Sequence, residues 1–187
     1  MKKLNLGAGK DKKEGYINID WNELDSPDIC HNLNQFPYPF SDGSFNEIEA
    51  NHILEHLDKP FMVMKELHRI LAPNGTLTIR VPHFSRGFSH PEHCHGFDTT
   101  FPLYFDKTAP GSGYFGVDFQ IVSMRFDYFA FLHLLPHLGF KKPTIFLLKI
   151  VNKIVTFFAN LSPYFTSRIW CYWVGGFEQI TFVFTKK

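Results

Sequence analysis

The sequence has few of the features that mark exported or disulfide-rich proteins. It holds only three cysteines, Cys30, Cys94 and Cys171, and no two of them form a C-x-x-C motif. A disulfide framework and a structural zinc site are therefore not expected, and a reducing cytoplasm is the predicted location. Met1-Lys2-Lys3 is not followed by the apolar segment of a signal peptide, so export is not predicted.

An excess of one charge and long apolar runs are also missing. Lys and Arg total 19 and Asp and Glu total 18, which leaves no electrostatic footprint for nucleic acid. No uncharged stretch reaches the length of about 18 residues that a helix needs to cross a bilayer, so a transmembrane segment is not predicted. The length of 187 residues fits one domain, which we expect to span residues 1–187.

The beginning of the chain contains two short apolar runs, each ending in residues suited to a ligand. Leu4-Asn5-Leu6 is followed by Gly7-Ala8-Gly9, and Ile17-Asn18-Ile19 is followed by Asp20. Ligands of open parallel sheets lie across the carboxyl ends of the strands. Gly7 and Gly9 allow a sharp turn and close approach of the backbone, and Asp20 can accept hydrogen bonds from a ribose diol. The pattern predicts a nucleotide-like ligand at this edge.

The first half of the chain alternates short strands with connecting segments, which predicts a parallel α/β sheet. Strands are expected at residues 3–6, 16–20, 45–51 and 76–81. Residues 7–15 leave room for at most a turn or two of helix. Asp58 is expected to cap a helix that starts near Pro60 and stops at Pro73-Asn74-Gly75.

The second half is unusual in composition, because 18 of the 22 Phe residues and half of the 10 His residues lie after residue 83. Residues 83–116 have no sustained periodicity and predict a long functional loop or lid. Residues 119–126 and 178–184 alternate as strands do. We expect the segments 83–118 and 128–175 to be insertions around a substrate site.

The segment 145–161 predicts a helix with a wide apolar face and one narrow polar stripe. The stripe consists of Lys149, Asn152, Lys153, Thr156 and Asn160. Packing of the apolar face against the sheet is the favoured interpretation. A subunit interface or an apolar substrate channel is the alternative, and peripheral membrane contact through Lys149 and Lys153 is a further one.

Lys12 argues against a nicotinamide dinucleotide as the ligand, because the dinucleotide fingerprint requires a third glycine at that position. Four segments instead resemble, in order, the type 11 domain of the class I S-adenosylmethionine-dependent methyltransferases. They are 4–9, 18–20, 36–45, and 52–57 together with 66–75. Their occurrence together is far more specific than any one of them.

This resemblance implies a fold, a cofactor and a set of contacts. The fold is a single Rossmann-like domain with a mostly parallel seven-stranded sheet, an antiparallel C-terminal strand, a shortened first helix and a helical insertion before the last strand. The cofactor is S-adenosylmethionine, with Asp20 on its ribose and Trp21 packed on its adenine. The other residues implied to bind it are Leu6, Gly7, Ala8, Gly9, Asn32, Leu33, Asn51 and His52.

Polar residues that could contact a substrate cluster after the last matched strand. They are His83, Arg86, His90, His93, His95 and Asp98. His83 or His93 is the candidate general base or substrate contact, since imidazole titrates near neutrality. The same residues could instead order the loop. A metal site of His90, His93, His95 and Cys94 is a further hypothesis, but their spacing matches no zinc pattern, and no metal is predicted.

The sequence thus predicts an enzyme that transfers a methyl group from S-adenosylmethionine to a small molecule, with oxygen as the acceptor atom. A saccharide or a lipid-linked intermediate is the substrate class considered. The alternative is a non-catalytic S-adenosylmethionine-binding protein or an activating subunit of a methyltransferase complex. Cover for the substrate must come from residues 83–175 or from a second subunit, so a homodimer is also considered.

Overall fold

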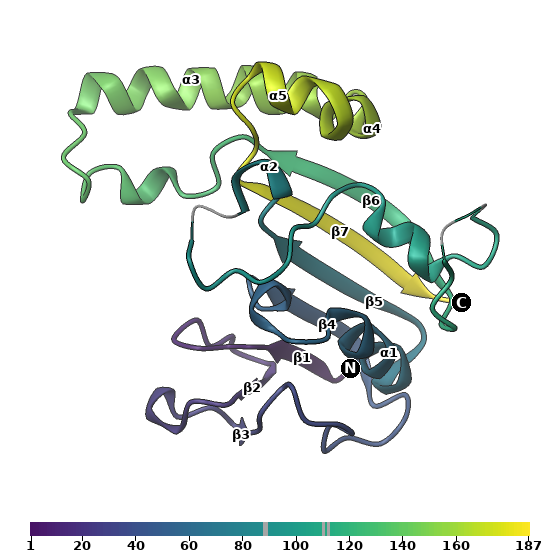
Figure 1. Ribbon diagram of the computed structural model, residues 1–187. Coiled ribbons are helices and arrows are strands. Elements are labelled where there is room, and N and C mark those ends of the chain that lie inside the picture. The colour runs from purple at the N-terminus through teal and green to yellow at the C-terminus, as the bar shows by residue number, and fades with distance from the viewer. Residues whose placement is uncertain (88–89, 110, 112) are drawn as a thin grey trace.

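A seven-stranded sheet of order β3-β2-β1-β4-β5-β7-β6 forms the centre of the computed structural model, which describes residues 1–87, 90–109, 111 and 113–187 (Figure 1). The strands are β1 (Lys3–Leu6), β2 (Ile17–Asp20), β3 (Ile29–Cys30), β4 (Phe45–Asn51), β5 (Leu71–Val81), β6 (Phe119–Asp127) and β7 (Gln179–Lys186). The first five run parallel, and β7 is antiparallel to β5 and β6. This arrangement confirms the predicted mostly parallel seven-stranded α/β sheet with an antiparallel C-terminal strand.

The connections differ in detail from the sequence prediction. The first crossover, residues 7–15, contains turns and no helix, so the shortened first helix is in fact absent. Helix α1 spans Pro60–Ile70, and its N-cap residue is Lys59, not Asp58. The chain enters β5 at Leu71, five residues earlier than expected, so α1 ends before the Pro73 turn.

The predicted loop after β5 is more structured than expected. It contains the short helix α2 (Phe84–Gly87) and a 3-10 helix at Phe101–Phe105. Phe97, Phe101 and Phe105 are buried, and the Phe101 ring lies 5.7 Å from that of Phe182 in β7. The aromatic excess of this segment therefore covers the sheet near its β7 side.

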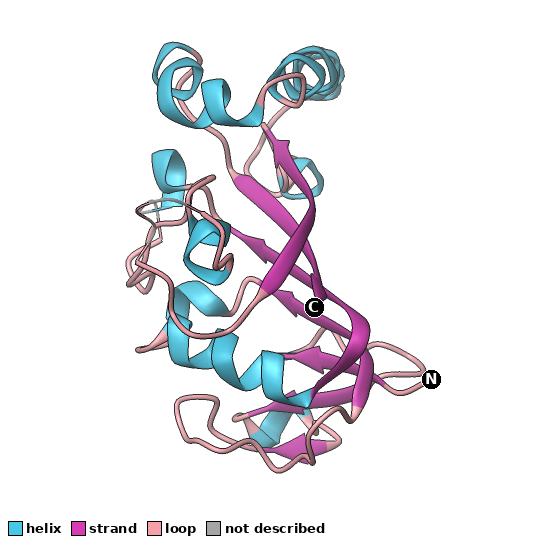
Figure 2. Ribbon diagram, turned by 90° about the vertical axis from the view of Figure 1, so that its right-hand side faces the viewer, coloured by secondary structure: helices cyan, strands magenta, loops and turns pink. Residues whose placement is uncertain are grey.

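Helices cover only one face of the parallel strands in the part of the chain that the structure describes (Figure 2). Along β5, Leu77, Ile79 and Val81 are buried beneath α1 and the following loop, whereas Thr78 and Arg80 between them are half-exposed. The same alternation recurs in β4 and β7. Such alternation is typical of a sheet with one solvated face, whereas a sheet covered on both faces has continuous apolar strands.

Ion pairs occupy the face without helices. Lys13 Nζ lies 2.6 Å and Arg80 Nη1 2.9 Å from Glu49 Oε2, and Lys3 Nζ lies 2.7 Å from Glu47. The hydroxyl of Tyr16 donates to Glu47 or Glu49, at 2.5 and 2.9 Å. Burial alone would raise the pKa of Glu49, but the hydrogen bonds from Lys13 and Arg80 lower it to about 2. The carboxylates of this face therefore stay charged at neutral pH.

Between β6 and β7 the chain forms a helical layer at the β6 end of the sheet (Figures 1 and 2). It consists of α3 (Lys142–Ala159), α4 (Pro163–Phe165), a π-helical turn (Thr166–Trp170) and α5 (Cys171–Trp173), after a 3-10 turn at Leu132–Leu134. Another 3-10 turn, Glu23–Asp25, follows β2. No single helix of the described chain is long and apolar enough to cross a bilayer. By length and composition, α3 and the Pro163–Trp173 segment could do so together, with a bend of 112° between them.

The orientation of α3 reverses the favoured interpretation of its sequence. Asn152, Thr156 and Asn160 of its polar stripe face the protein and bond the backbone of residues 126–129. Most of the apolar side chains point outward, and only Val155 and Ala159 contact the core. Packing of the wide apolar face against the sheet is therefore wrong for most of this helix.

Candidate functional site

The predicted cofactor residues converge at the carboxyl ends of β1, β2 and β4, which are neighbours in the sheet. Both glycines of the first turn have left-handed backbone angles, with φ of +67° at Gly7 and +47° at Gly9. A Cβ on Gly7 would lie 2.5 Å from Cγ1 of Ile53, so protein packing requires that glycine. A Cβ on Gly9 would meet no described atom within 4 Å. The open space beside Gly9 leaves the backbone there accessible to a ligand.

Asp20 links the ends of β1 and β2. Its Oδ2 accepts a hydrogen bond of 2.8 Å from the Gly9 amide, and its Oδ1 accepts one of 3.0 Å from the Asn22 amide. The residue is 6% exposed. A carboxylate oxygen has two lone pairs, so both oxygens retain capacity for a further donor such as a ribose hydroxyl.

The remaining predicted contacts lie at or just after the carboxyl ends of β1 to β4. Leu6, Ala8 and Leu33 are buried, whereas Trp21 is 69% exposed beside Asp20. Asn32 is exposed, and its Oδ1 accepts from the Asn34 amide. Asn51 Oδ1 accepts from Arg80 at 2.5 Å.

His52, at the end of β4, has an unusual backbone for a residue with a side chain, with φ of +50°. Its Nδ1 lies 3.2 Å from Glu55 Oε1 and its Nε2 lies 2.8 Å from Gln179 Oε1. Burial opposes protonation of this ring, but the hydrogen bonds to Glu55 and Gln179 raise its pKa. His52 thus joins the strand ends where the cofactor is predicted to bind, here called the cofactor edge, to a second group of polar residues.

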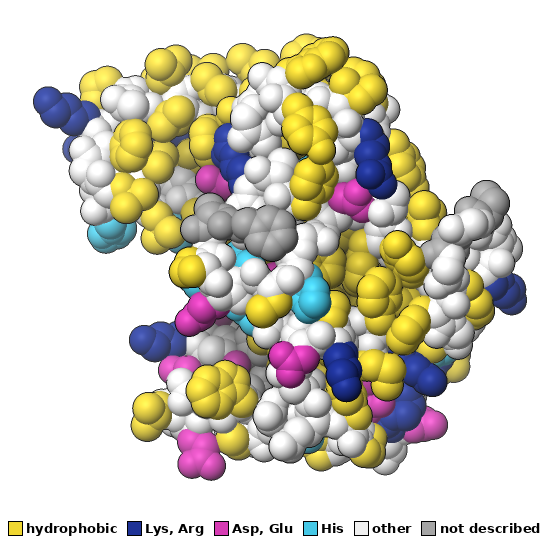
Figure 3. Space-filling view, in the orientation of Figure 1, with side chains coloured by type: hydrophobic (Ala, Val, Ile, Leu, Met, Phe, Trp, Pro, Cys, Tyr) yellow, Lys and Arg dark blue, Asp and Glu magenta, His cyan; other side chains and the backbone are white. Residues whose placement is uncertain are grey.

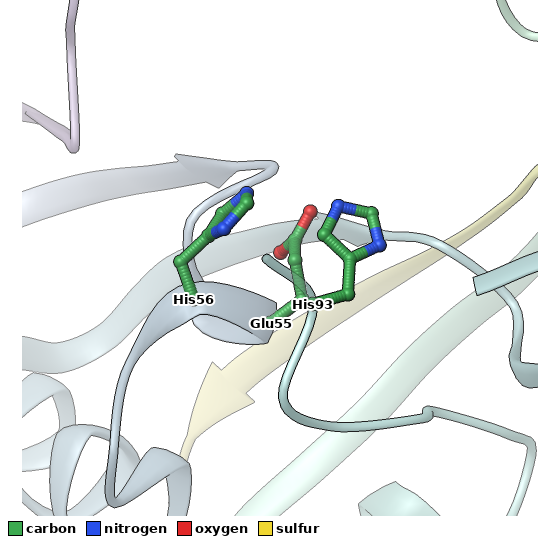
Figure 4. Close-up of side chains that lie close together, drawn as sticks. All are labelled: Glu55, His56 and His93. Atoms are coloured by element: carbon green, nitrogen blue, oxygen red, sulfur yellow. The ribbon is translucent and has the colours of Figure 1, made fainter. Parts of the chain in front are cut away.

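That second group lines a cavity of about 370 Å³. Its walls comprise His52, Glu55, His56, Pro82, Arg86, His90, His93, Phe131 and Glu178. The His93 and His90 rings stack with centroids 4.8 Å apart, and the His56 ring meets that of His93 edge-on at 4.8 Å. In Figure 4, the Glu55 carboxylate lies between His56 and His93. Because His52 belongs to both places, the cavity adjoins the cofactor edge.

His83 does not line this cavity. The residue is fully buried, and its ring nitrogens lie 2.7 Å from Ser85 Oγ and 3.0 Å from Ser167 Oγ. Burial lowers the pKa of His83 to about 4, so the ring is neutral at physiological pH. His83 connects the end of β5 to the π-helical turn, and we withdraw it as a candidate base.

The buried His83 ring predicts a pH-dependent loss of stability. Between its ordinary pKa of 6.5 and its folded value of about 4, the unfolded chain binds a proton that the folded protein does not. The contribution of the neutral His83 ring to the free energy of unfolding is fully present above pH 6.5. It falls by about 3 kcal/mol as the pH is lowered to about 4. Urea unfolding of the wild type and of His83→Gln across this range measures it. Equal pH slopes in the two proteins would contradict the assignment.

The other histidine-loop residues are divided between two places. His95 and Asp98 line a different cavity of about 450 Å³ together with Arg168, which lies 3.1 Å from Asp98. Cys94 is exposed. The four residues of the metal hypothesis, His90, His93, Cys94 and His95, therefore do not converge.

Sequence reasoning missed the contributions of Glu55 and Glu178 to the cavity of about 370 Å³, whereas Arg86, which was among the predicted substrate contacts, does line it. His56 faces His93 from the 3-10 turn Leu54–His56, which follows β4. The adjacent acid and imidazole at positions 55 and 56 were a usable signal, since they follow a strand end.

Comparisons with known proteins agree with this geometry. The family model described as methyltransferase domain matches residues 8–79. A methyltransferase structure from Archaeoglobus fulgidus, described as SAM dependent, superposes with a TM-score of 0.60 at 15% identity, covering 99% of this chain and 86% of that one. No curated protein sequence matches.

Two further structures show how varied the proteins with this fold are. The [4+2]-cyclase SpnF gives a TM-score of 0.58 at 11% identity, covering 99% of this chain and 75% of the other. A protein in complex with the Trm112 methyltransferase activator of Haloferax volcanii gives 0.55 at 13% identity, with coverage of 99% and 81%. At such identities the likeness shows the fold alone, and the reaction must be argued from the site.

Proposed function

We propose that the protein transfers the methyl group of S-adenosylmethionine to an oxygen of a small molecule, because residues 8–79 match the methyltransferase domain model and the fold is similar to that of a methyltransferase described as SAM dependent. The observation that carries the proposal is the hydrogen bond from the Gly9 amide to Asp20, near a cavity whose walls include histidines and carboxylates. The cofactor supplies its own leaving group in an in-line displacement. The protein must therefore hold both reactants in line and exclude water.

The cofactor residues have separate tasks in this proposal. Asp20 accepts hydrogen bonds from the ribose hydroxyls, and the open side of Gly9 faces the methionine part. The exposed Trp21 ring covers the adenine, and Asn32 and Leu33 border it. Asn51 and His52, with Leu6, Gly7 and Ala8 beneath them, border the methionine part at the ends of β4 and β1.

The cavity of about 370 Å³ is the proposed acceptor site. Its volume fits a small molecule, and its histidines and carboxylates offer hydrogen bonds to hydroxyl groups. His93 lies on the cavity wall, unlike the buried His83, and is the ring proposed to contact the acceptor's hydroxyl and receive its proton. Saccharides and lipid-linked sugars are the substrate classes to examine first.

Two measurements test the proposal. Calorimetry should show binding of S-adenosylhomocysteine, and NAD should give no thermal protection. Transfer of a labelled methyl group should then be sought on a panel of hydroxylated acceptors, with His93→Ala expected to reduce the rate by about 10²–10⁴-fold. Cofactor binding without transfer to any acceptor would favour the non-catalytic or activating role instead, and protection by NAD alone would contradict the cofactor.

A further inference from the structure

Three side chains from two segments of the chain come together on the wall of the acceptor cavity. Glu55, His56 and His93 each present one ligand atom, and all three atoms lie within 4.8 Å of one another (Figure 4). The amide of Cys94 donates to the Glu55 carbonyl at 2.9 Å, which holds the His93 segment beside the turn after β4. The cluster is thus fixed by backbone contacts rather than by chance proximity.

The Glu55 carboxylate is buried without a full set of hydrogen bonds. The residue is fully buried, and its Oε2 has no hydrogen-bond partner within the described residues. Its other oxygen lies 3.2 Å from His52. A buried carboxylate oxygen without a partner is costly and calls for an explanation, such as a bound cation.

The His93 ring is oriented as a metal ligand would be. Its Nδ1 donates to the carbonyl of Gly87, which places the ring proton on that nitrogen. The lone pair is therefore on Nε2, and Figure 4 shows one ring nitrogen turned toward the Glu55 carboxylate. Metal-binding histidines commonly donate their second nitrogen to a backbone carbonyl in this way.

From this geometry we propose that Glu55, His56 and His93 bind a divalent first-row transition metal ion. Two imidazoles and one carboxylate suit zinc, iron or cobalt, and leave positions open for water or a substrate oxygen. Ligand atoms around a tetrahedral ion lie about 3.3 Å apart, so small side-chain rotations from the present spacing complete the site.

The metal would have a use in the proposed reaction, and this part alone rests on the proposed function. A cation in the cavity would hold the acceptor's hydroxyl and lower its pKa. His93 would then act as a metal ligand in place of its role as proton acceptor, and the proton of the metal-bound hydroxyl would pass to solvent water.

Metal binding can be measured on the full chain without cofactor or acceptor, so its outcome is separate from that of the proposed function. We expect calorimetric titration with Zn²⁺ and visible spectroscopy with Co²⁺ to show one ion per chain. Glu55→Gln and His93→Ala should each weaken binding at least 100-fold. His137→Ala changes an exposed histidine outside the cluster and should leave it unaltered.

Cooperative urea unfolding of Glu55→Gln, which preserves the side-chain shape, checks that the variant is folded. An unchanged affinity in both cluster variants, or no ion bound by the wild type, overturns the metal site. Equal weakening by His137→Ala would assign the ion to surface histidines and overturn it as well.

A different observation carries a second inference. Helix α3 presents Asn152, Thr156 and Asn160 of its polar stripe to the protein and most of its apolar side chains to the outside. Phe157 is 63% and Leu161 is 66% exposed, and Trp173 in α5 is 73% exposed. Figure 3 shows apolar side chains gathered along the top of the molecule, over α3 to α5. Apolar exposure of this extent marks an interaction surface.

The positive charge of the same segment indicates an anionic lipid surface as the partner. Residues 128–177 hold no Asp or Glu and five Lys or Arg residues, in a chain whose overall charge is nearly balanced. Lys149 and Lys153 are exposed beside the apolar side chains of α3, where their long stems can reach lipid headgroups. Exposed aromatic rings such as Trp173 suit the interface between headgroups and acyl chains.

We infer that α3 and the α4–α5 segment, which together form the helical layer, lie on an anionic membrane surface, with their apolar side chains in the interface. The bound fraction in vesicle flotation should be several-fold higher with phosphatidylglycerol present than with phosphatidylcholine alone. The double variant Phe157→Gln, Leu161→Gln should lower the affinity at least tenfold, since it removes two apolar contacts. Leu24→Gln, which changes a leucine that is 92% exposed in the turn after β2, far from the layer, should not.

Light scattering without vesicles tests the competing occupant, a second copy of the chain. A stable dimer that is lost in the double variant, with no binding to vesicles, overturns the membrane proposal. Equal binding to both kinds of vesicle would overturn the role of the lysines. If the double variant does not unfold cooperatively, Trp173→Gln alone is tested in its place. Its affinity for the anionic vesicles should also be lower than that of the wild type.

Discussion

Asp20→Ala is expected to weaken binding of S-adenosylhomocysteine by about 10²–10⁴-fold. Two hydrogen bonds from a ribose diol to a carboxylate contribute roughly 1.5–3 kcal/mol each, and every 1.4 kcal/mol corresponds to a tenfold change. The variant also releases the Gly9 and Asn22 amides, which Asp20 now holds at 2.8 and 3.0 Å. Isothermal titration calorimetry measures the dissociation constant directly.

The control is Glu23→Ala, which removes an exposed carboxylate three residues further along the chain. Its affinity should equal that of the wild type. Asp20→Asn, which keeps the shape and one acceptor oxygen, should fall between the two. Wild-type affinity in Asp20→Ala would refute our placement of the ribose.

Gly7→Ala is expected to destabilise the folded protein by about 2–5 kcal/mol. Roughly 1–2 kcal/mol arises from placing a side chain at φ of +67°, and roughly 1–3 kcal/mol from overpacking against Ile53. Urea unfolding monitored by circular dichroism gives the free energy. Ile53 follows β4, so the same collision should also disturb the cofactor edge.

Gly9→Ala supplies the matched comparison, because it makes the same change at φ of +47° where no described atom would be touched. We expect Gly9→Ala to lower the free energy of unfolding by only roughly 1–2 kcal/mol, which is the cost of the backbone strain. Its main effect should be on cofactor affinity, since the open side of Gly9 faces the proposed ligand. Equal stability losses in the two variants would show that Ile53 does not set the requirement at Gly7.

The first half of the fold was predictable because its signals are local. The runs before Gly7 and Asp20 and the β-branched run ending at Val81 gave strands close to those observed. Strand β3 has only two residues, Ile29 and Cys30, and pairs with β2 through backbone contacts, so no periodicity could reveal it. The uncovered face of the sheet was signalled by the alternation in β4 and β7 but was not inferred.

The candidate site was predictable only in part, because its second half depends on contacts distant in sequence. The turn at Gly7–Gly9 and Asp20 could be located from the chain alone. The burial of His83 depends on Ser167, and the pairing of His93 with Glu55 depends on how a long segment returns to the sheet. Similarly, the hydrogen bonds from Asn160 to Phe126 decide which side of α3 faces inward, and composition cannot show this.

The sheet with helices on only one side has a consequence for how this molecule can vary. A two-layer design leaves most of the 51 residues between β6 and β7 outside the shared core, with Val155 and Ala159 among the few that join it. Changes on the outer side of that segment and changes near Asp20 have no packing partners in common, so their energies should simply add. The proposed membrane contact and the proposed reaction could therefore change independently of each other during evolution.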